Sequence, residues 1–218
     1  MAAAHPIGVI GPNAVIQLGE ALRAMLGEQR AAGLYAQAGC AAWFTAPPDA
    51  MVDERRTAAL HQALRCNLPA EAPRILADAG RRTGDYILAH RIPKPAQWLL
   101  RHVPAGLAGP LLLDAITRHA WTFAGTGRFM AMRGHPCLVE IAGNPLVAGE
   151  RAAAPVCVWH AAVFRRLFQA LVHPAAEVRE IACGAAGAPA CRFEIAWPNG
   201  LWRPAAVTPL AGGATRPA

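Results

Sequence analysis

The segments CVWHAAVFRRLF (157–168) and EIACGAAGAPAC (180–191) decide how the C-terminal part of this chain folds. They supply four metal-ligating side chains in the spacing C-x22-E-x2-C-x7-C, namely Cys157, Glu180, Cys183 and Cys191. Three thiolates and one carboxylate can complete a tetrahedral shell around Zn²⁺. Cys157 begins an amphipathic stretch, and the dipole at a helix start favours a thiolate. A zinc ion there would tie the hairpin around residues 183–191 to the preceding helix.

The same four residues also have a simpler interpretation. Free cysteines are often small buried hydrophobes. Cys191 alternates with Phe193 and Ile195, which is typical of a strand with one buried face, and Glu180 fits a solvated strand position. The spacing alone therefore leaves both a structural zinc site and plain core packing open.

The sequence around the four residues is similar to a known family. The segments that carry the likeness are RRTGDYILAHRIPKPAQ (81–97), RHAWTFAGTGRF (118–129), CVWHAAVFRRLF (157–168) and CRFEI (191–195), and it covers about residues 10 to 197. They resemble the 4-vinyl-reductase domain family, and most of all its bacteriochlorophyll-biosynthesis members. The family also forms the effector-sensing domain of phenol- and xylene-responsive bacterial regulators. The resemblance implies a compact α+β domain, often dimeric through its helices, with structural zinc bound by Cys157, Glu180, Cys183 and Cys191.

Length and composition predict one folded unit. The chain has 218 residues, of which 54% are hydrophobic, enough for a sizeable core. We expect a single ligand-binding domain over residues 1–197 and a Pro/Gly-rich, poorly ordered tail over 198–218. The most apolar run, LAGPLLLDAI (107–116), is too short to span a bilayer and contains Pro110 and Asp114.

The cysteines and the N-terminus indicate a compartment. The segment MAAAHPIGVIGP (1–12) has no basic region followed by a long apolar stretch, so we expect no signal peptide. Six cysteines in such a chain favour reduced thiols and a metal over a disulfide framework. Cys40, Cys66 and Cys137 are then structural, and the expected location is cytoplasmic.

The net charge of +7 comes almost entirely from arginine, since Lys94 is the single lysine. The arginines are dispersed and accompany no helix-turn-helix, zinc-finger or RNA-binding motif, so we expect no nucleic-acid partner. A planar ligand with carboxylates, or peripheral contact with an anionic membrane surface, fits this charge better. Candidate partners for carboxylates are Arg81, Arg82 and Arg128.

Hydrophobic periodicity predicts helices in the N-terminal half and strands after residue 118. Apolar residues recur at helical spacing over about 12–25, 31–44, 54–65, 70–91, 105–118 and 156–172. Pro93 and Pro95 are expected to break the fourth of these. Alternating patterns predict strands over 119–124, 129–133, 137–141, 177–183 and 190–197. The fold class is therefore α+β: a helical N-terminal half packed on a mostly antiparallel sheet, with a zinc-stapled C-terminal helix and hairpin.

No segment supplies a recognisable nucleotide or redox-cofactor site. No G-x-G-x-x-G follows a strand, and IGVIGPN (7–13) is interpreted as an entry turn. The cysteines lack the short C-x2-C repeats of iron–sulfur proteins. A zinc ion with four protein ligands lacks the open position that catalysis needs. We therefore assign no catalytic residue, and whether the chain is an enzyme stays open.

Aromatic and histidine side chains gather in the segments that resemble the family. The ligand-binding candidates are His119, Trp121, Phe123, Phe129, Trp159, His160 and Phe164. Flat aromatic walls suit a tetrapyrrole or a small aromatic effector, and a neutral imidazole can ligate the Mg²⁺ of a chlorophyll precursor. Each of these residues also fits ordinary core packing.

Three hypotheses of function follow. The first is a zinc-stabilised bacteriochlorophyll-biosynthesis protein, cytoplasmic and a homodimer, that binds a Mg-porphyrin or chlorophyllide-type intermediate and presents or carries it to chlorophyll-pathway enzymes. The second takes the family name literally, as a vinyl reductase acting on a (bacterio)chlorophyll precursor with an external reductant. The third is a sensor domain for a small aromatic molecule.

Overall fold

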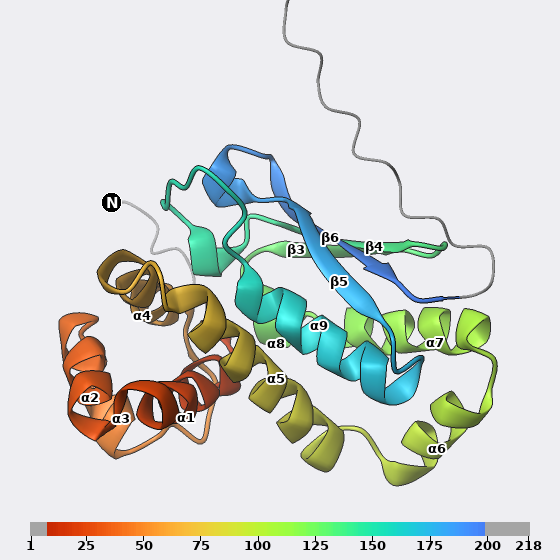
Figure 1. Ribbon diagram of the computed structural model, residues 1–218, viewed down its shortest axis with the longest axis horizontal. Coiled ribbons are helices and arrows are strands. Elements are labelled where there is room, and N and C mark those ends of the chain that lie inside the picture. Colours follow the sequence, from red (N-terminus) through yellow and green to blue (C-terminus); the bar gives the residue numbers. More distant parts are fainter. Residues whose placement is uncertain (1–7, 199–218) are drawn as a thin grey trace, which may run out of the picture.

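The computed structural model describes residues 8–198, so the tail expected over 198–218 lies outside the described residues from position 199 onward. Helices dominate the first part of the chain, and a sheet with one inserted helix follows (Figure 1). The helices are α1 (Asn13–Leu26), α2 (Glu28–Gln37), α3 (Ala41–Thr45), α4 (Glu54–Asn67), α5 (Ala72–His90), α6 (Lys94–His102), α7 (Ala105–Arg118), α8 (Trp121–Ala124) and α9 (Val158–Leu171).

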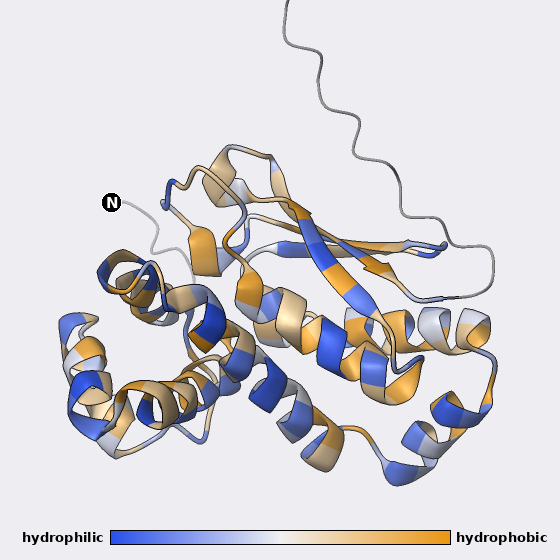
Figure 2. Ribbon diagram, viewed as in Figure 1, coloured by the Kyte–Doolittle hydropathy of each residue, from blue (hydrophilic) through white to orange (hydrophobic). Residues whose placement is uncertain are grey.

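The main sheet has the strand order β3-β4-β6-β5, and each neighbouring pair is antiparallel. Its strands are β3 (Arg128–Met132), β4 (Cys137–Ala142), β5 (Glu177–Ala182) and β6 (Ala190–Ala196). Opposite residues on one face are buried, such as Val139 with Phe193 and Ile141 with Cys191. Hydrophilic and hydrophobic residues alternate along β5, as a half-buried strand requires (Figure 2). These strands confirm the expected α+β class.

Helix α9 connects β4 to β5 and packs between the sheet and α5 (Figure 1). Two glycines of α5 allow the close approach of the two helices. A Cβ atom at Gly80 would overlap the carbonyl oxygen of Trp159 and lie 2.6 Å from Cβ of Ala162. One at Gly84 would lie 2.7 Å from Cβ of Arg166. The backbones therefore meet closely enough for α9 to share its core with both halves of the molecule.

A short two-stranded sheet closes the N-terminal end. Residues Val9–Ile10 (β1) pair with Val52–Asp53 (β2), so the expected entry turn is partly strand. Glu54 follows β2, and its buried carboxylate accepts hydrogen bonds from the backbone N–H (2.9 Å) and hydroxyl (2.6 Å) of Thr126. A helix of the N-terminal half is thereby tied to the turn that precedes β3.

The strand expected over 119–124 is wrong. Residues Trp121–Ala124 form the short helix α8, and Gly125 ends it with φ of 55°. Thr122 donates its hydroxyl hydrogen to the carbonyl of His119 at 2.8 Å, a local bond that favours a turn over a strand. The alternation that suggested a strand spans few residues, and over so short a stretch it does not separate strand from helix.

Other differences arise at proline and glycine. The helix expected over 31–44 is two, because Gly39 takes φ of 69° between α2 and α3. Pro93 ends the preceding helical segment, but Pro95 lies in the first turn of α6, where a missing N–H costs nothing. The helices expected over 54–65, 70–91, 105–118 and 156–172 are confirmed. Between residues 8 and 198, no helix is both long and apolar enough to cross a bilayer.

Gly80→Ala is expected to destabilise the protein by about 1–3 kcal/mol, because the added methyl group would force α5 and α9 apart. Gly33→Ala is the matched control, since a methyl group added to Gly33 in α2 would meet no atom within 4 Å among residues 8–198 beyond its own helix. That change should be neutral or stabilising by up to about 1 kcal/mol. Urea unfolding of both variants measures the difference, and equal effects would contradict the close packing.

Candidate functional site

The fold brings the four predicted metal ligands together. Cys157 precedes α9, Glu180 is on β5, Cys183 follows β5 and Cys191 is on β6. One ligand atom from each lies within 4.8 Å of all the others. The three cysteines are buried and Glu180 is half-buried. Residues separated by up to 34 positions thus converge where α9 begins.

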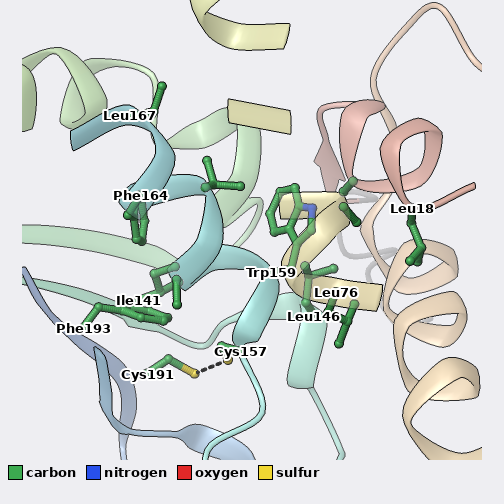
Figure 3. Close-up of a cluster of buried hydrophobic side chains, with 14 of the residues drawn as sticks. Leu18, Leu76, Ile141, Leu146, Cys157, Trp159, Phe164, Leu167, Cys191 and Phe193 are labelled. Atoms are coloured by element: carbon green, nitrogen blue, oxygen red, sulfur yellow. Dashed lines mark hydrogen bonds between the residues drawn. The ribbon is translucent and has the colours of Figure 1, made fainter. Parts of the chain in front are cut away.

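The sulfur spacings fit a tetrahedral metal ion. The Sγ atoms of Cys157 and Cys191 are 3.4 Å apart, those of Cys157 and Cys183 are 3.8 Å apart, and those of Cys183 and Cys191 are 4.0 Å apart. Metal–sulfur bonds of about 2.3 Å in a tetrahedron place sulfurs about 3.8 Å apart. A disulfide requires about 2.05 Å. Figure 3 shows the Cys157 and Cys191 side chains pointing toward one another beneath the hydrophobic core.

Amide groups surround the sulfurs. The side-chain Nδ2 of Asn144 donates to Sγ of Cys157 at 3.4 Å and to Sγ of Cys191 at 3.5 Å. The backbone N–H of Gly184 donates to Cys191 at 3.4 Å. Asn144 is itself fixed, because its Oδ1 accepts the backbone N–H of Leu146 at 3.1 Å. Such donors orient metal-bound thiolates and stabilise their negative charge. The sequence analysis assigned the turn around Asn144 but not this role.

The charges of the cluster also favour a cation. The hydrogen bond donated by Cys157 lowers the pKa of the Cys191 thiol to about 3, while hydrogen bonds to Cys183 and Cys191 raise the pKa of Cys157. Burial raises the pKa of the Glu180 carboxyl to about 8. Its Oε2 accepts the backbone N–H of Cys157 at 2.7 Å, but its buried Oε1 has no partner within residues 8–198. A metal ion would satisfy that oxygen and stabilise the thiolates together.

Four side chains complete this shell. A shell closed by protein groups leaves no position for water or substrate, which is the arrangement of structural metal sites. The cluster can therefore hold a metal that links α9 to the hairpin of β5 and β6.

The predicted aromatic candidates separate into two groups. Phe123, Phe129 and Phe164 pack together, with ring centroids 5.4 to 6.4 Å apart, and His160 lies 6.3 Å from Phe123. Phe193, which was not predicted, is 5.5 Å from Phe164. The second group lies outside this cluster and comprises two exposed side chains and one buried side chain that points elsewhere: His119, Trp121 and Trp159.

Trp159 faces the helical half of the molecule instead. Figure 3 shows it on the side of α9 near Leu76, away from Phe164. Its ring is 5.9 Å from that of His61, whose Nε2 lies 2.9 Å from the carbonyl oxygen of Ala14. Nothing in the sequence spacing marked His61, because its α4 pattern is that of any half-buried helix.

His160 is the most unusual of the candidates. Its side chain is 1% exposed, and its Nε2 has no hydrogen-bond partner in the described part of the chain. Burial lowers the pKa of its imidazole to about 3, so the ring is neutral at physiological pH. The Nε1–H of neighbouring Trp159 is likewise buried without a partner there. Buried polar atoms normally have partners, so this pair marks a place where a ligand atom or water would be stabilised.

The arginines proposed to pair with carboxylates already have protein partners in part. A surface hollow of about 360 Å³ between α5 and α9 is lined by Arg74, Arg81, Arg165 and Arg166 together with Asp78. Arg81 pairs with Asp78 (2.6 Å), and Arg82 pairs with the same carboxylate (2.6 Å). Arg128 is exposed on β3.

Comparisons with known proteins agree with the predicted family. The family model of the 4-vinyl-reductase domain matches residues 138–196. The bacteriochlorophyll synthase 23 kDa chain of Cereibacter sphaeroides is 52% identical over 186 residues, which are 85% of this chain and 89% of that one. The protein of the same name from Rhodobacter capsulatus is 43% identical over 187 residues, covering 85% and 86%.

Solved structures with a similar fold are H-NOX proteins. An unliganded Fe(II) H-NOX variant from K. algicida has a TM-score of 0.59 at 11% identity, with 88% of this chain and 98% of that chain covered. An H-NOX chain studied for heme distortion has a TM-score of 0.55 at 10% identity, covering 89% and 98%. At such low identity the likeness concerns the fold alone.

The buried histidines are expected to make stability depend on pH. Burial lowers the pKa of His61 to about 3, whereas in the unfolded chain a histidine titrates near about 6.5. Below about pH 6.5 the unfolded state therefore binds a proton that the native state does not, and the free energy of unfolding falls by up to about 1.4 kcal/mol per pH unit. His61→Gln should reduce this slope between pH 6.5 and 5 by about one proton.

His90→Gln serves as the control, because His90 is exposed at the end of α5 and should leave the slope unchanged. Urea unfolding at a series of pH values provides the measurement. An unchanged slope in His61→Gln would mean that the buried imidazole is protonated in the native protein.

Proposed function

Because the chain belongs to the family of the bacteriochlorophyll synthase 23 kDa chains, we propose that it acts in bacteriochlorophyll biosynthesis by binding a magnesium tetrapyrrole and presenting it to pathway enzymes. The relatives are named as one chain of a synthase, which supports a role beside other enzymes of the pathway. The similarity to H-NOX chains, one of them described for its heme distortion, supports the capacity of this fold to accommodate a porphyrin.

The observation that carries the proposal is His160. A neutral imidazole has a lone pair on one nitrogen, and the Nε2 of His160 is buried without a partner among the described residues. Mg²⁺ in a tetrapyrrole accepts such an axial ligand. Phe123, Phe164 and Phe193 surround the ring with flat apolar surfaces, which suit the face of a macrocycle.

The proposed site lies between α9 and the segment of α8 and β3. Phe123 contacts Phe129, His160 and Phe164, so a macrocycle enters only if α8 moves outward. That helix has four residues and carries the exposed Trp121 on its outer side. In this proposal Trp121 and Phe129 line the opened site, His119 lies at its rim, and Trp159 lies behind His160.

We further infer that the metal held by the cysteine cluster is zinc. Three thiolates with one carboxylate in a tetrahedron are donors that zinc prefers. The ion would hold the first turn of α9 against β5 and β6. His160 is in that first turn, so zinc would support the position of the proposed ligand to magnesium without taking part in chemistry.

Protein produced with adequate zinc under reducing conditions is expected to contain about one Zn²⁺ per chain. Cys183→Ser should lower the zinc content and reduce the free energy of unfolding by about 3 kcal/mol or more, because structural metal binding is coupled to folding. Cys66→Ser is the control, since Cys66 is exposed on α4. Metal analysis and thermal unfolding report both effects. Unchanged zinc content in Cys183→Ser would exclude the assigned site.

Purified protein is expected to bind Mg-protoporphyrin with a dissociation constant of about 1 µM or lower. His160→Phe should weaken this binding about tenfold or more, because it removes the axial ligand but keeps an aromatic ring. Binding of the metal-free porphyrin should change little in the same variant. Tryptophan quenching and the Soret band follow both titrations, and His119→Phe is the control at an exposed histidine.

Equal losses for the magnesium and metal-free ligands would remove His160 as a magnesium ligand. Failure of the wild-type protein to bind any tetrapyrrole would overturn the proposal. The vinyl-reductase hypothesis has its own assay, in which the protein alone receives a divinyl substrate and NADPH. The carrier proposal predicts no ethyl product there and faster turnover of a pathway enzyme supplied with the bound pigment.

A further inference from the structure

The hairpin of α6 and α7 exposes a concentration of large apolar side chains. Trp98 is 62% exposed and Leu107 is 60% exposed, and Leu99 and Leu111 are each 48% exposed. These are four of the nine large hydrophobic residues exposed within residues 8–198, and they fall in a span of 14 positions. Figure 2 shows α7 as mostly orange and pale, with little of the blue that marks hydrophilic residues. Such a concentration indicates an interaction surface.

Polar contacts on its inner side hold α6 in this orientation. Gln97 is buried, and its Nε2 donates to the carbonyl oxygens of Leu88 (2.5 Å) and Ile92 (2.8 Å). Arg101 donates from Nε to the carbonyl oxygen of Ala170 at 3.0 Å. Trp98 is therefore turned outward, where its ring stacks on His102 with centroids 4.4 Å apart. The exposure of Trp98 follows from how the helix is attached.

The charge around these residues has one sign. Residues 86–113 contain no Asp or Glu, but they contain Arg91, Lys94 and Arg101. Neither Arg91 nor Lys94 forms an ion pair within the part of the chain that the structure describes. The acidic residues that flank the span are already paired, Asp85 with Arg81 and Arg166, and Asp114 with Arg133. The apolar side chains therefore have cationic neighbours alone.

We propose that the hairpin of α6 and α7 docks on the surface of an anionic lipid bilayer. An indole ring prefers the headgroup level of a membrane, and leucine side chains enter the adjoining acyl region. Lysine and arginine at the same depth attract anionic headgroups. A uniformly cationic border complements a uniformly anionic surface, whereas a typical protein partner presents charges of both signs. This docking is independent of pigment binding, since none of its residues lines the proposed tetrapyrrole site.

Flotation of the pigment-free full chain with vesicles tests the proposal. The protein should bind vesicles of phosphatidylcholine mixed with phosphatidylglycerol, bind phosphatidylcholine alone weakly, and be released by high salt. Trp98→Ala should weaken binding to the mixed vesicles about fivefold or more. Trp121→Ala is the matched control, because Trp121 is 59% exposed on α8, outside the hairpin, and should bind like wild type.

A second pair of variants tests the charges. Arg91→Gln with Lys94→Gln should weaken binding to the mixed vesicles, whereas Arg30→Gln with Arg55→Gln, at exposed sites on α2 and α4, should do so much less. Equal losses in both double variants would reduce the effect to net charge and overturn the assigned surface. Absence of vesicle binding by the wild-type chain would overturn the proposal. So would a vesicle-free dimer that Trp98→Ala dissociates, because the surface would then belong to a second copy.

Discussion

The close packing of α5 against α9 is the constraint on which the other features depend. Gly80 and Gly84 remove the side chains that would separate the two backbones. Helix α9 can then reach both the helical half, through Trp159, and the sheet, through Phe164. Cys157 at its start and His160 one turn later take their positions from this contact. The metal cluster and the proposed pigment site are thus placed by one helix, which is itself placed by two missing side chains.

The two ends of the proposed machinery differ in rigidity. The cysteine cluster is closed by four side chains and by amide donors from Asn144 and Gly184. The aromatic cluster is held by ring contacts alone, and its outer member Phe123 is on a helix of four residues. Directional bonds fix one side of His160, and nondirectional packing covers the other side. A ligand that displaces Phe123 would exchange one set of apolar contacts for another and leave the metal cluster intact.

The sequence predicted the helices with long apolar periodicity and the four metal ligands, the latter through the family resemblance that singles out their spacing. It predicted less well where structure depends on contacts distant in the chain. The alternation of His119, Trp121 and Phe123 imitates a strand, but the segment forms a helix. Asn144 and His61 act through partners that spacing does not reveal. Pro95 was interpreted as a helix breaker although it starts α6, because a proline is compatible with either.

The buried carboxylate of Glu54 limits how this chain can vary. Its oxygens fill the space beside Gly8 and Gly125, where a Cβ atom at either position would overlap the carboxyl group. Gly125 also takes a positive φ, so two separate reasons exclude a side chain there. In a protein of this fold, positions 8, 54, 125 and 126 should therefore change as a set. A shorter residue at 54 would allow side chains at 8 but would leave the hydroxyl and N–H of Thr126 without their acceptor. One buried carboxylate thus couples four positions drawn from three separate parts of the chain.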